Sequence, residues 1–288
     1  MPHVERPDGA QIYYEVFGSG FPLLLFAPGG VNSQIGFWRR SAINPIEAFS
    51  DEFMVIGMDQ RNAGNSSAPL SAVSYDLTAG DQRAVLDAAG VDRALVMGGC
   101  IGVAYCLRII KEAPDRIVGA VCQDPVGLDH TNSIDVFMAM FQPTIALARE
   151  KGVPAVVASA EANPIFVTNN DAGPFAARIA RDGAFKDDVL ALSTDAYVKL
   201  IEDYAAGVWP DSPPFMSVPE EWVPTCPAAL LVLPGSDPFH PTSVAQRLCE
   251  LAPDATCLDV DCRSNAEKLP GTIEAIRAFL REQAAKAG

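Results

Sequence analysis

The order of apolar and polar residues divides the first part of the chain into short apolar runs separated by amphipathic stretches. The segment QIYYEVF at 11–17 alternates in polarity between turn-forming sequences, which predicts an antiparallel strand at the edge of a sheet. The runs at 22–27 and 54–59 are continuously apolar, as in strands that a parallel sheet buries on both faces. Residues 76–90 are amphipathic and end at Gly90, so we expect a helix there.

The alternation of strand and helix continues as far as residue 124. Residues 94–97 and 117–123 predict buried strands, and residues 101–113 between them predict a helix that ends before Pro114. This alternation is typical of a parallel sheet wound with right-handed crossovers.

The middle of the chain has a different pattern. Residues 125–222 contain helical segments and no convincing strand, which predicts a helical cap over the sheet. We therefore expect residues 1–124 and 223–288 to form the core. Its second part resumes the earlier pattern, with predicted strands at 228–237 and 256–260 and predicted helices at 243–251 and 271–286.

Composition and charge narrow the function classes. The chain has 288 residues, of which 49% are hydrophobic and 20% charged, as in a globular protein with one large domain or a domain carrying an insertion. Its net charge of −15 repels phosphate backbones and anionic lipids, so neither nucleic acid nor a membrane is expected as a partner. With no apolar run of about 18 residues and no secretory signal pattern at the start, we expect a cytoplasmic protein.

The cysteine and histidine pattern gives no sign of a structural metal. The seven cysteines form no Cys-x-x-Cys pair, and His3, His130 and His240 lie far apart in the sequence. We expect free, mostly buried thiols, with Cys106 and Cys122 as core residues. No glycine fingerprint for a dinucleotide and no P-loop is present, so we expect no cofactor and no metal.

The segment GGCIG at 98–102 carries the strongest chemical signal. A Gly-x-Cys-x-Gly sequence between a strand and a helix has the form of a nucleophile elbow, with sulfur in place of the usual serine oxygen. The glycines are needed because the apex residue is strained and its neighbours pack closely. A helix N-terminus directly behind Cys100 favours its thiolate form.

Three other segments extend this pattern. They are FAPGG at 26–30, MDQRNAGNSSAP at 58–69 and LPGSDPFHP at 233–241. With the elbow, they make the chain resemble the α/β-hydrolase superfamily over nearly its whole length. The resemblance implies an α/β fold with a mostly parallel, eight-stranded sheet, flanking helices and a helical cap insertion.

The resemblance also implies roles for individual residues. Cys100 would be the nucleophile and Asp237 the catalytic acid. Backbone N–H groups of Ile101 and of the Gly29-Gly30 loop would form the oxyanion hole. Asp124, which follows the preceding strand, is an alternative position for the acid.

The chain departs from the superfamily in its histidine. That histidine should follow the last predicted strand, where this chain has Asp261, Cys262 and Arg263. Three alternatives remain: His240 serves as the base, His130 reaches the site from the cap, or Cys262 or Asp261 occupies the place without any histidine.

These residues predict a cofactor-independent hydrolase with a cysteine nucleophile. Dienelactone hydrolases, which resemble this chain in fold, use a cysteine at the elbow. The substrate would be a small, largely apolar molecule with an ester, lactone, thioester or activated C–C bond. Acyl transfer or lyase chemistry in the same pocket, a non-catalytic ligand-binding protein and a homodimer all stay open. The residues expected to line an apolar pocket are Trp38, Phe137, Phe141 and Trp209.

Overall fold

The structure, a computed structural model, describes residues 2–288. In this range the strands form one eight-stranded sheet with the order β1-β2-β4-β3-β5-β6-β7-β8. Strand β2 pairs antiparallel with β1 and β4, and every other neighbouring pair is parallel. The strands are β1 (His3–Glu5), β2 (Gln11–Phe17), β3 (Phe21–Phe26), β4 (Phe53–Met58), β5 (Ala94–Gly99), β6 (Ile117–Gln123), β7 (Ala229–Leu233) and β8 (Ala255–Cys257).

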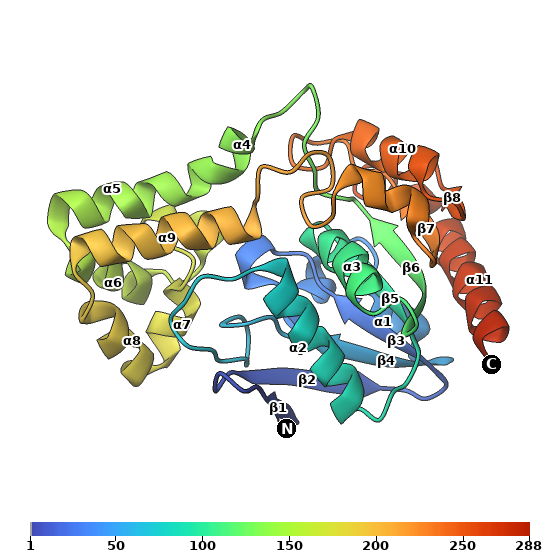
Figure 1. The fold of residues 1–288 in the computed structure, drawn as a ribbon, viewed down its shortest axis with the longest axis horizontal. Coiled ribbons are helices and arrows are strands. Elements are labelled where there is room, and N and C mark those ends of the chain that lie inside the picture. Colours follow the sequence, from blue (N-terminus) through green and yellow to red (C-terminus); the bar gives the residue numbers. More distant parts are fainter. Residues whose placement is uncertain (1) are drawn as a thin grey trace.

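Burial explains why the central strands are continuously apolar. Every residue of β5 and β7 is buried, because helices cover both faces of the sheet. One face packs against α1 and α11, and the other against α2, α3 and α10 (Figure 1). These helices are α1 (Pro45–Phe49), α2 (Tyr75–Ala88), α3 (Ile101–Glu112), α10 (Thr242–Leu251) and α11 (Leu269–Ala287).

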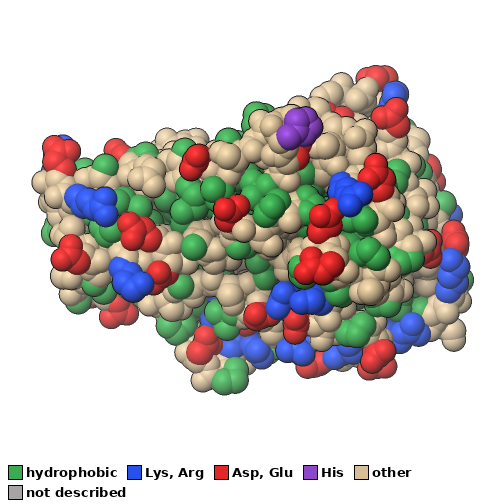
Figure 2. Space-filling view, turned by 45° about the horizontal axis from the view of Figure 1, so that its top comes forward, with side chains coloured by type: hydrophobic (Ala, Val, Ile, Leu, Met, Phe, Trp, Pro, Cys, Tyr) green, Lys and Arg blue, Asp and Glu red, His purple; other side chains and the backbone are tan. Residues whose placement is uncertain are grey.

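The segment between β6 and β7 is helical and contains no strand. Its helices lie together at one end of the molecule in Figure 1, within the range expected for the cap. On the face drawn in Figure 2, hydrophobic side chains gather between this end and the rest of the molecule. The helices are α4 (Ile134–Met138), α5 (Gln142–Lys151), α6 (Val153–Ala162), α7 (Ala176–Arg181), α8 (Gly183–Leu190) and α9 (Thr194–Val208).

The parallel strands bring several loops to one edge of the sheet. Since β3, β5, β6, β7 and β8 run in the same direction, the loops that follow them meet at their carboxyl ends. Open α/β sheets bind ligands at this edge. The segments singled out in the sequence around residues 29, 100, 124, 237 and 263 all follow these strands.

Three details differ from expectation. The strand at 11–17 is not at the edge, because His3–Glu5 pairs along its outer side. Cys249 and Cys257 form a disulfide between α10 and β8, so these two thiols are not free. The helical sequence at 185–209, which has no strong break and could form one helix, forms two, α8 and α9, because Ser193 begins a new helix by capping the Ala196 N–H. In residues 2–288, no helix has both the length and the apolarity needed to cross a bilayer.

Candidate active site

Cys100 occupies a sharp turn between β5 and α3. Its backbone lies in an unusual region, at φ 57° and ψ −123°, a conformation that costs free energy and is found mainly at functional sites. The turn depends on its glycines: a Cβ at Gly98 would lie 2.2 Å from the carbonyl carbon of Gly102, and one at Gly102 would lie 2.0 Å from the Phe26 carbonyl oxygen. The sequence therefore forms the predicted elbow, and the Cys100 side chain stays partly exposed.

His240 lies next to this elbow, on the loop after β7. Its Nδ1 is 2.7 Å from Oδ1 and 2.8 Å from Oδ2 of Asp237. The backbone N–H groups of Phe239 and His240 also donate to Asp237 Oδ1, at 2.9 and 3.1 Å, which fixes the carboxylate. Gly235 permits this tight loop, because a Cβ there would lie 2.5 Å from the Cβ of His240.

The pKa values show that the thiol and the imidazole interact. Burial raises the pKa of Cys100, but the charge of His240 and its hydrogen bond to the thiol outweigh burial and hold the pKa below its ordinary value. Burial lowers the pKa of His240, whereas the Cys100 thiolate and the bond to Asp237 raise it to about 9. Both shifts favour a thiolate–imidazolium pair.

The other free cysteines lack such a partner. Burial raises the pKa of the thiols of Cys106, Cys122 and Cys226. Burial also raises the pKa of Cys262, to about 12. Of the five free cysteines in the described part of the chain, Cys100 is the one whose pKa is lowered. A nucleophilic thiolate is therefore favoured at this position alone.

The residues expected to form the oxyanion hole lie close to Cys100. The Ile101 N–H, at the start of α3, donates to the thiolate. Gly29 and Gly30 have backbone φ values of 123° and 56°, which residues with a side chain rarely adopt. Both glycines line the same cavity as Cys100 and His240. The residues expected to form the oxyanion hole thus lie around the thiol.

That cavity has a volume of about 390 Å³ and is mainly apolar. Phe137 and Trp209 line it as expected, with their ring centroids 4.9 Å apart. Phe141 does not line it; this ring is fully buried and packs against Phe166 instead. Trp38 is also absent from this cavity and lines a second one on another side of Cys100.

The arrangement of sheet, elbow and loops matches a known family. A family model described as the alpha/beta hydrolase fold matches residues 22–262. The chain belongs to the α/β-hydrolase fold family. The fold expected from the four sequence segments is confirmed by this match and by the strand order.

Curated proteins match part of the chain. "Putative carbamate hydrolase RutD" of Azorhizobium caulinodans is 38% identical over 117 residues, which are 41% of this chain and 42% of that protein. The soluble epoxide hydrolase of a Corynebacterium species is 31% identical over 96 residues, 33% of this chain and 32% of that protein. The chain spans less than half the length of the curated relatives it matches.

Solved structures show the same fold over nearly the whole chain. A thermophilic esterase from Thermogutta terrifontis aligns with a TM-score of 0.65 and 18% identity, covering 98% of both chains. Est816, described as an N-acyl homoserine lactone degrading enzyme, aligns with a TM-score of 0.60 and 23% identity, covering 96% of this chain and 100% of that one.

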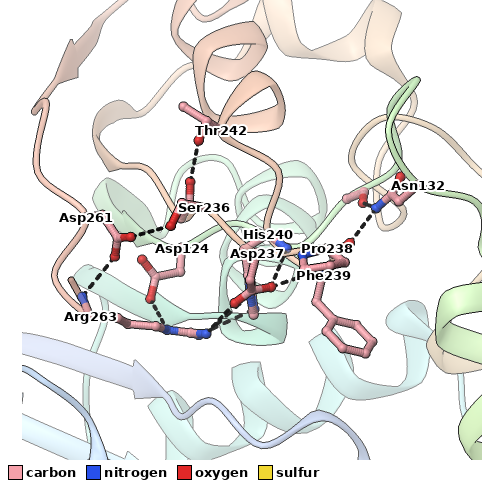
Figure 3. Close-up of polar contacts among 12 residues, drawn as sticks. Asp124, Asn132, Ser236, Asp237, Pro238, Phe239, His240, Thr242, Asp261 and Arg263 are labelled. Carbon is pink, nitrogen blue, oxygen red and sulfur yellow. Dashed lines mark hydrogen bonds and ion pairs between the residues drawn. The ribbon is translucent and has the colours of Figure 1, made fainter.

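In this α/β-hydrolase, Arg263 reaches the site from the loop after β8, the place where the superfamily carries its histidine. Its Nε donates to Asp124 Oδ2 at 2.9 Å and its Nη1 to Asp237 Oδ2 at 2.8 Å (Figure 3). Its Nη2 lies 3.5 Å from His240 Nε2. An arginine stays protonated in proteins and cannot accept a proton, so it cannot replace the histidine as a base. No role is predicted for Arg263 from the sequence, although its place after the last predicted strand is a signal.

The remaining candidates lie outside the Cys100–His240–Asp237 cluster. The His130 side chain is 84% exposed and lies 3.8 Å from Asp129. Asp124 pairs with Arg263 and has no hydrogen bond to His240. Cys262 is buried on the α11 side of the sheet. Asp261 accepts hydrogen bonds from Ser236 and Ser264.

In residues 2–288, no group of three His, Cys, Asp or Glu side chains is arranged to hold a metal ion.

Proposed function

We propose that this chain is a cysteine-dependent hydrolase in which Cys100, His240 and Asp237 act together on a carbonyl carbon. The observation that carries the proposal is the bonded His240–Asp237 pair in the cavity that His240 lines together with Cys100 at the elbow. The name of the Azorhizobium relative, a carbamate hydrolase, supports a hydrolytic reaction at a carbonyl group.

The first half of the reaction forms a thioester. The Cys100 thiolate attacks the carbonyl carbon, and the Ile101 and Gly29-Gly30 N–H groups stabilise the negative charge on its oxygen. The imidazolium of His240 then gives its proton to the leaving alcohol or amine. Asp237 holds the ring through Nδ1, which leaves Nε2 for this transfer.

The second half releases the acyl group. Neutral His240 takes a proton from water, the resulting hydroxide attacks the thioester carbon, and the C–S bond breaks to restore the thiolate and the imidazolium. No histidine follows the last strand, so in this proposal His240 supplies the proton acceptor from the loop after β7. The position of His240 favours catalysis over passive binding.

The substrate class follows from the cavity. Its volume of about 390 Å³ and its aromatic wall suit a small, largely apolar acyl group. We therefore propose an ester, lactone or thioester of such an acid as the substrate, with an activated C–C bond next to a carbonyl as the alternative.

Intact-mass spectrometry tests the proposal. The protein is mixed with 4-nitrophenyl butyrate and quenched in acid during turnover. We expect one added acyl mass on the wild-type chain, none on Cys100→Ala, and an unchanged adduct on the matched control Cys226→Ala, because that thiol is buried and its pKa is raised. Turnover by Cys100→Ala, or neither adduct nor turnover in wild type with any of a series of esters and lactones, would overturn it.

A further inference from the structure

Bonds within the loop after β7 hold His240 and Asp237 together. Besides the contacts of Nδ1 with the carboxylate, the two residues form an isolated antiparallel bridge, and the His240 N–H donates to the Asp237 carbonyl at 2.9 Å. Thr242 Oγ1 closes the base of the loop by donating to the Gly235 carbonyl at 2.7 Å. These bonds fix the imidazole relative to its carboxylate, whereas Cys100 lies on another loop. Contacts from outside the loop after β7 therefore determine where the pair lies relative to the thiol.

One group of outside contacts comes from residues 127–132, the entry turn, which leads from β6 to α4. Asn132 Nδ2 donates to the Pro238 carbonyl at 2.8 Å (Figure 3). The Gly127 N–H donates to the Phe239 carbonyl at 3.4 Å. The carbonyls of the two residues directly before His240 are thus both bonded to the entry turn.

The entry turn also bonds to the chain beyond His240. Ser243 Oγ, in the first turn of α10, donates to Asp129 Oδ2. The Asp129 side chain is only 11% exposed, so water competes little for this bond. Because Pro238 and Ser243 lie on either side of His240 in the sequence, the entry turn holds the loop both before and after the imidazole.

The entry turn is held in shape by its own side chains. Asn132 Oδ1 accepts the Asp129 N–H at 2.9 Å, and its Nδ2 donates to the Gly127 carbonyl at 2.9 Å as well as to Pro238. Asp129 Oδ1 accepts from the N–H and the hydroxyl of Thr131, at 2.7 and 2.6 Å. The Asn132 amide therefore makes three bonds, two inside the entry turn and one to the loop of His240.

The base of the entry turn packs tightly against its surroundings. A Cβ at Gly127 would lie 2.3 Å from the Pro214 carbonyl oxygen and 2.6 Å from Val244 Cγ1. The Leu128 N–H donates to the same Pro214 carbonyl at 3.0 Å. The entry turn is thus fixed against α10 and against the segment that returns from α9, and it can serve as a firm support for the loop after β7.

From these contacts we propose that Asn132 and Asp129 are positioning residues that hold the His240 imidazole in place beside the Cys100 thiol. The proposal rests on the role of His240 in the proposed function. Neither Asn132 nor Asp129 lines the apolar cavity, so both act through His240. Arg263 contacts the loop after β7 from the side of β8, and the entry turn contacts it from the side of α4.

The charged and titratable groups around His240 come from four places. They are Cys100 on the elbow, Asp237 on its own loop, Arg263 on the loop after β8 and Asp124 at the end of β6. The charge of His240 and its hydrogen bond lower the pKa of the Cys100 thiol. An imidazole that moves away from the elbow loses both interactions, so the pKa of Cys100 rises toward its ordinary value.

Alkylation of Cys100 tests the proposal without a substrate. The protein is treated with iodoacetamide over a series of pH values, and peptide mass spectrometry measures the rate of alkylation at residue 100. Asn132→Leu keeps the size of the side chain but removes its three bonds. We expect this variant to move the alkylation profile to higher pH, in the same direction as His240→Ala.

Asn163→Leu is the matched control. Asn163 also bonds within a turn, where its Oδ1 accepts the Ile165 N–H at 3.1 Å and its Nδ2 donates to Thr168 Oγ1 at 3.3 Å. These bonds do not involve the loop after β7, so we expect the alkylation profile of Asn163→Leu to match that of wild type.

Variants of Ser243 separate positioning from folding. Ser243→Ala removes the donor to Asp129 and should move the profile in the same direction as Asn132→Leu, whereas Ser243→Thr keeps a hydroxyl and should match wild type. Thermal melting identifies conditions under which every variant is folded, and a loss of stability alone leaves the profile of the folded protein unchanged. Unmoved profiles in both Asn132→Leu and Ser243→Ala would overturn the proposal.

Ester hydrolysis separates this proposal from the proposed function. With 4-nitrophenyl butyrate we expect Asn132→Leu to lower kcat/KM about 3- to 10-fold, mainly through kcat, as for the loss of a hydrogen bond. A shifted alkylation profile in a protein that forms no acyl adduct would reject the thioester function and retain the positioning role. An acyl adduct on wild type with unmoved alkylation profiles in the variants would reject the positioning role alone.

Discussion

The loops after β7 and β8 contribute opposite kinds of chemistry to the same site. The loop after β7 carries the proposed acid and base, Asp237 and His240, within hydrogen-bonding distance of each other. The loop after β8 supplies Arg263, a permanent cation that contacts both residues. The resemblance to the superfamily implies an acid and a histidine on separate loops, whereas the proposed acid and base of this chain lie on the same loop.

In the proposed mechanism the base therefore lies on the loop after β7 instead of the loop after β8. His240 lines the same cavity as Cys100 from the loop after β7, because the loops after β7 and β8 both lie at the carboxyl edge of the sheet. The position on the loop after β8 is occupied by Arg263, which transfers no proton in the proposed mechanism. Arg263 instead adjusts the charge of the site: it lowers the pKa values of Cys100, His240 and Asp237.

Replacing His240 gives the largest effect among the variants that compare the two loops. We expect His240→Ala to lower kcat/KM for an activated ester by about 10²- to 10⁴-fold, because general acid–base transfer by a positioned side chain contributes that range. His130→Ala is the control and should keep the wild-type rate, since that side chain is exposed. Steady-state kinetics measures both, and equal rates for His240→Ala and wild type would remove His240 from the mechanism.

Replacing the acid tests the other member of the pair. Asp237→Asn keeps the shape but weakens the hold on His240 Nδ1, so we expect a loss in kcat/KM of about 10²-fold. Asp261→Asn on the loop after β8 is the matched control, because Asp261 bonds to Ser236 and Ser264 and not to His240. A larger loss from Asp261→Asn than from Asp237→Asn would reverse the assignment of the acid.

The fold was predictable because a strand that is buried on both faces has a continuous run of apolar residues. The runs at 22–27, 54–59 and 117–123 correspond to strands β3, β4 and β6, to within one residue at each end. The elbow was predictable for a similar reason, since Gly98 and Gly102 have no room for a Cβ. Both depend on local sequence and close packing.

The composition of the site was harder to predict, because loop conformation decides it. The spacing of Asp237 and His240 permits a bonded pair or two separate turn residues, and packing near Gly235 settles the choice. Trp38 lines a second cavity beside Cys100 because it lies in the short 3-10 helix at Ile35–Arg40, which hydrophobic periodicity does not specify. The disulfide Cys249–Cys257 joins a helix to a short edge strand across a turn, so spacing alone did not indicate it.

The pH profile tests the charge that Arg263 supplies. In wild type, kcat/KM should rise as Cys100 ionises below its ordinary pKa and fall again as His240 loses its proton near pH 9. Because Arg263 lowers both pKa values, Arg263→Gln should move both limbs of the profile to higher pH. The maximal rate should change less than about tenfold, as half-exposed ion pairs contribute little energy. Arg263→Lys keeps the charge and should stay closer to wild type; an unmoved profile in Arg263→Gln would contradict the role.

Removing the disulfide should have the smallest effect on catalysis. It tests whether the loops after β7 and β8 depend on each other for their positions. The disulfide ties α10, which follows the loop of His240, to β8, which precedes the loop of Arg263. Closing so short a loop restricts the unfolded chain, so Cys249→Ser with Cys257→Ser should lower the free energy of unfolding by about 2 kcal/mol. The melting temperature should fall by about 5 °C. We expect kcat/KM at 25 °C and its pH profile to stay as in wild type, because neither sulfur lies in the Cys100–His240–Asp237 cluster. Adding reductant to the double variant should produce no further change in melting. A shifted pH profile in this variant would mean that the position of Arg263 relies on the disulfide.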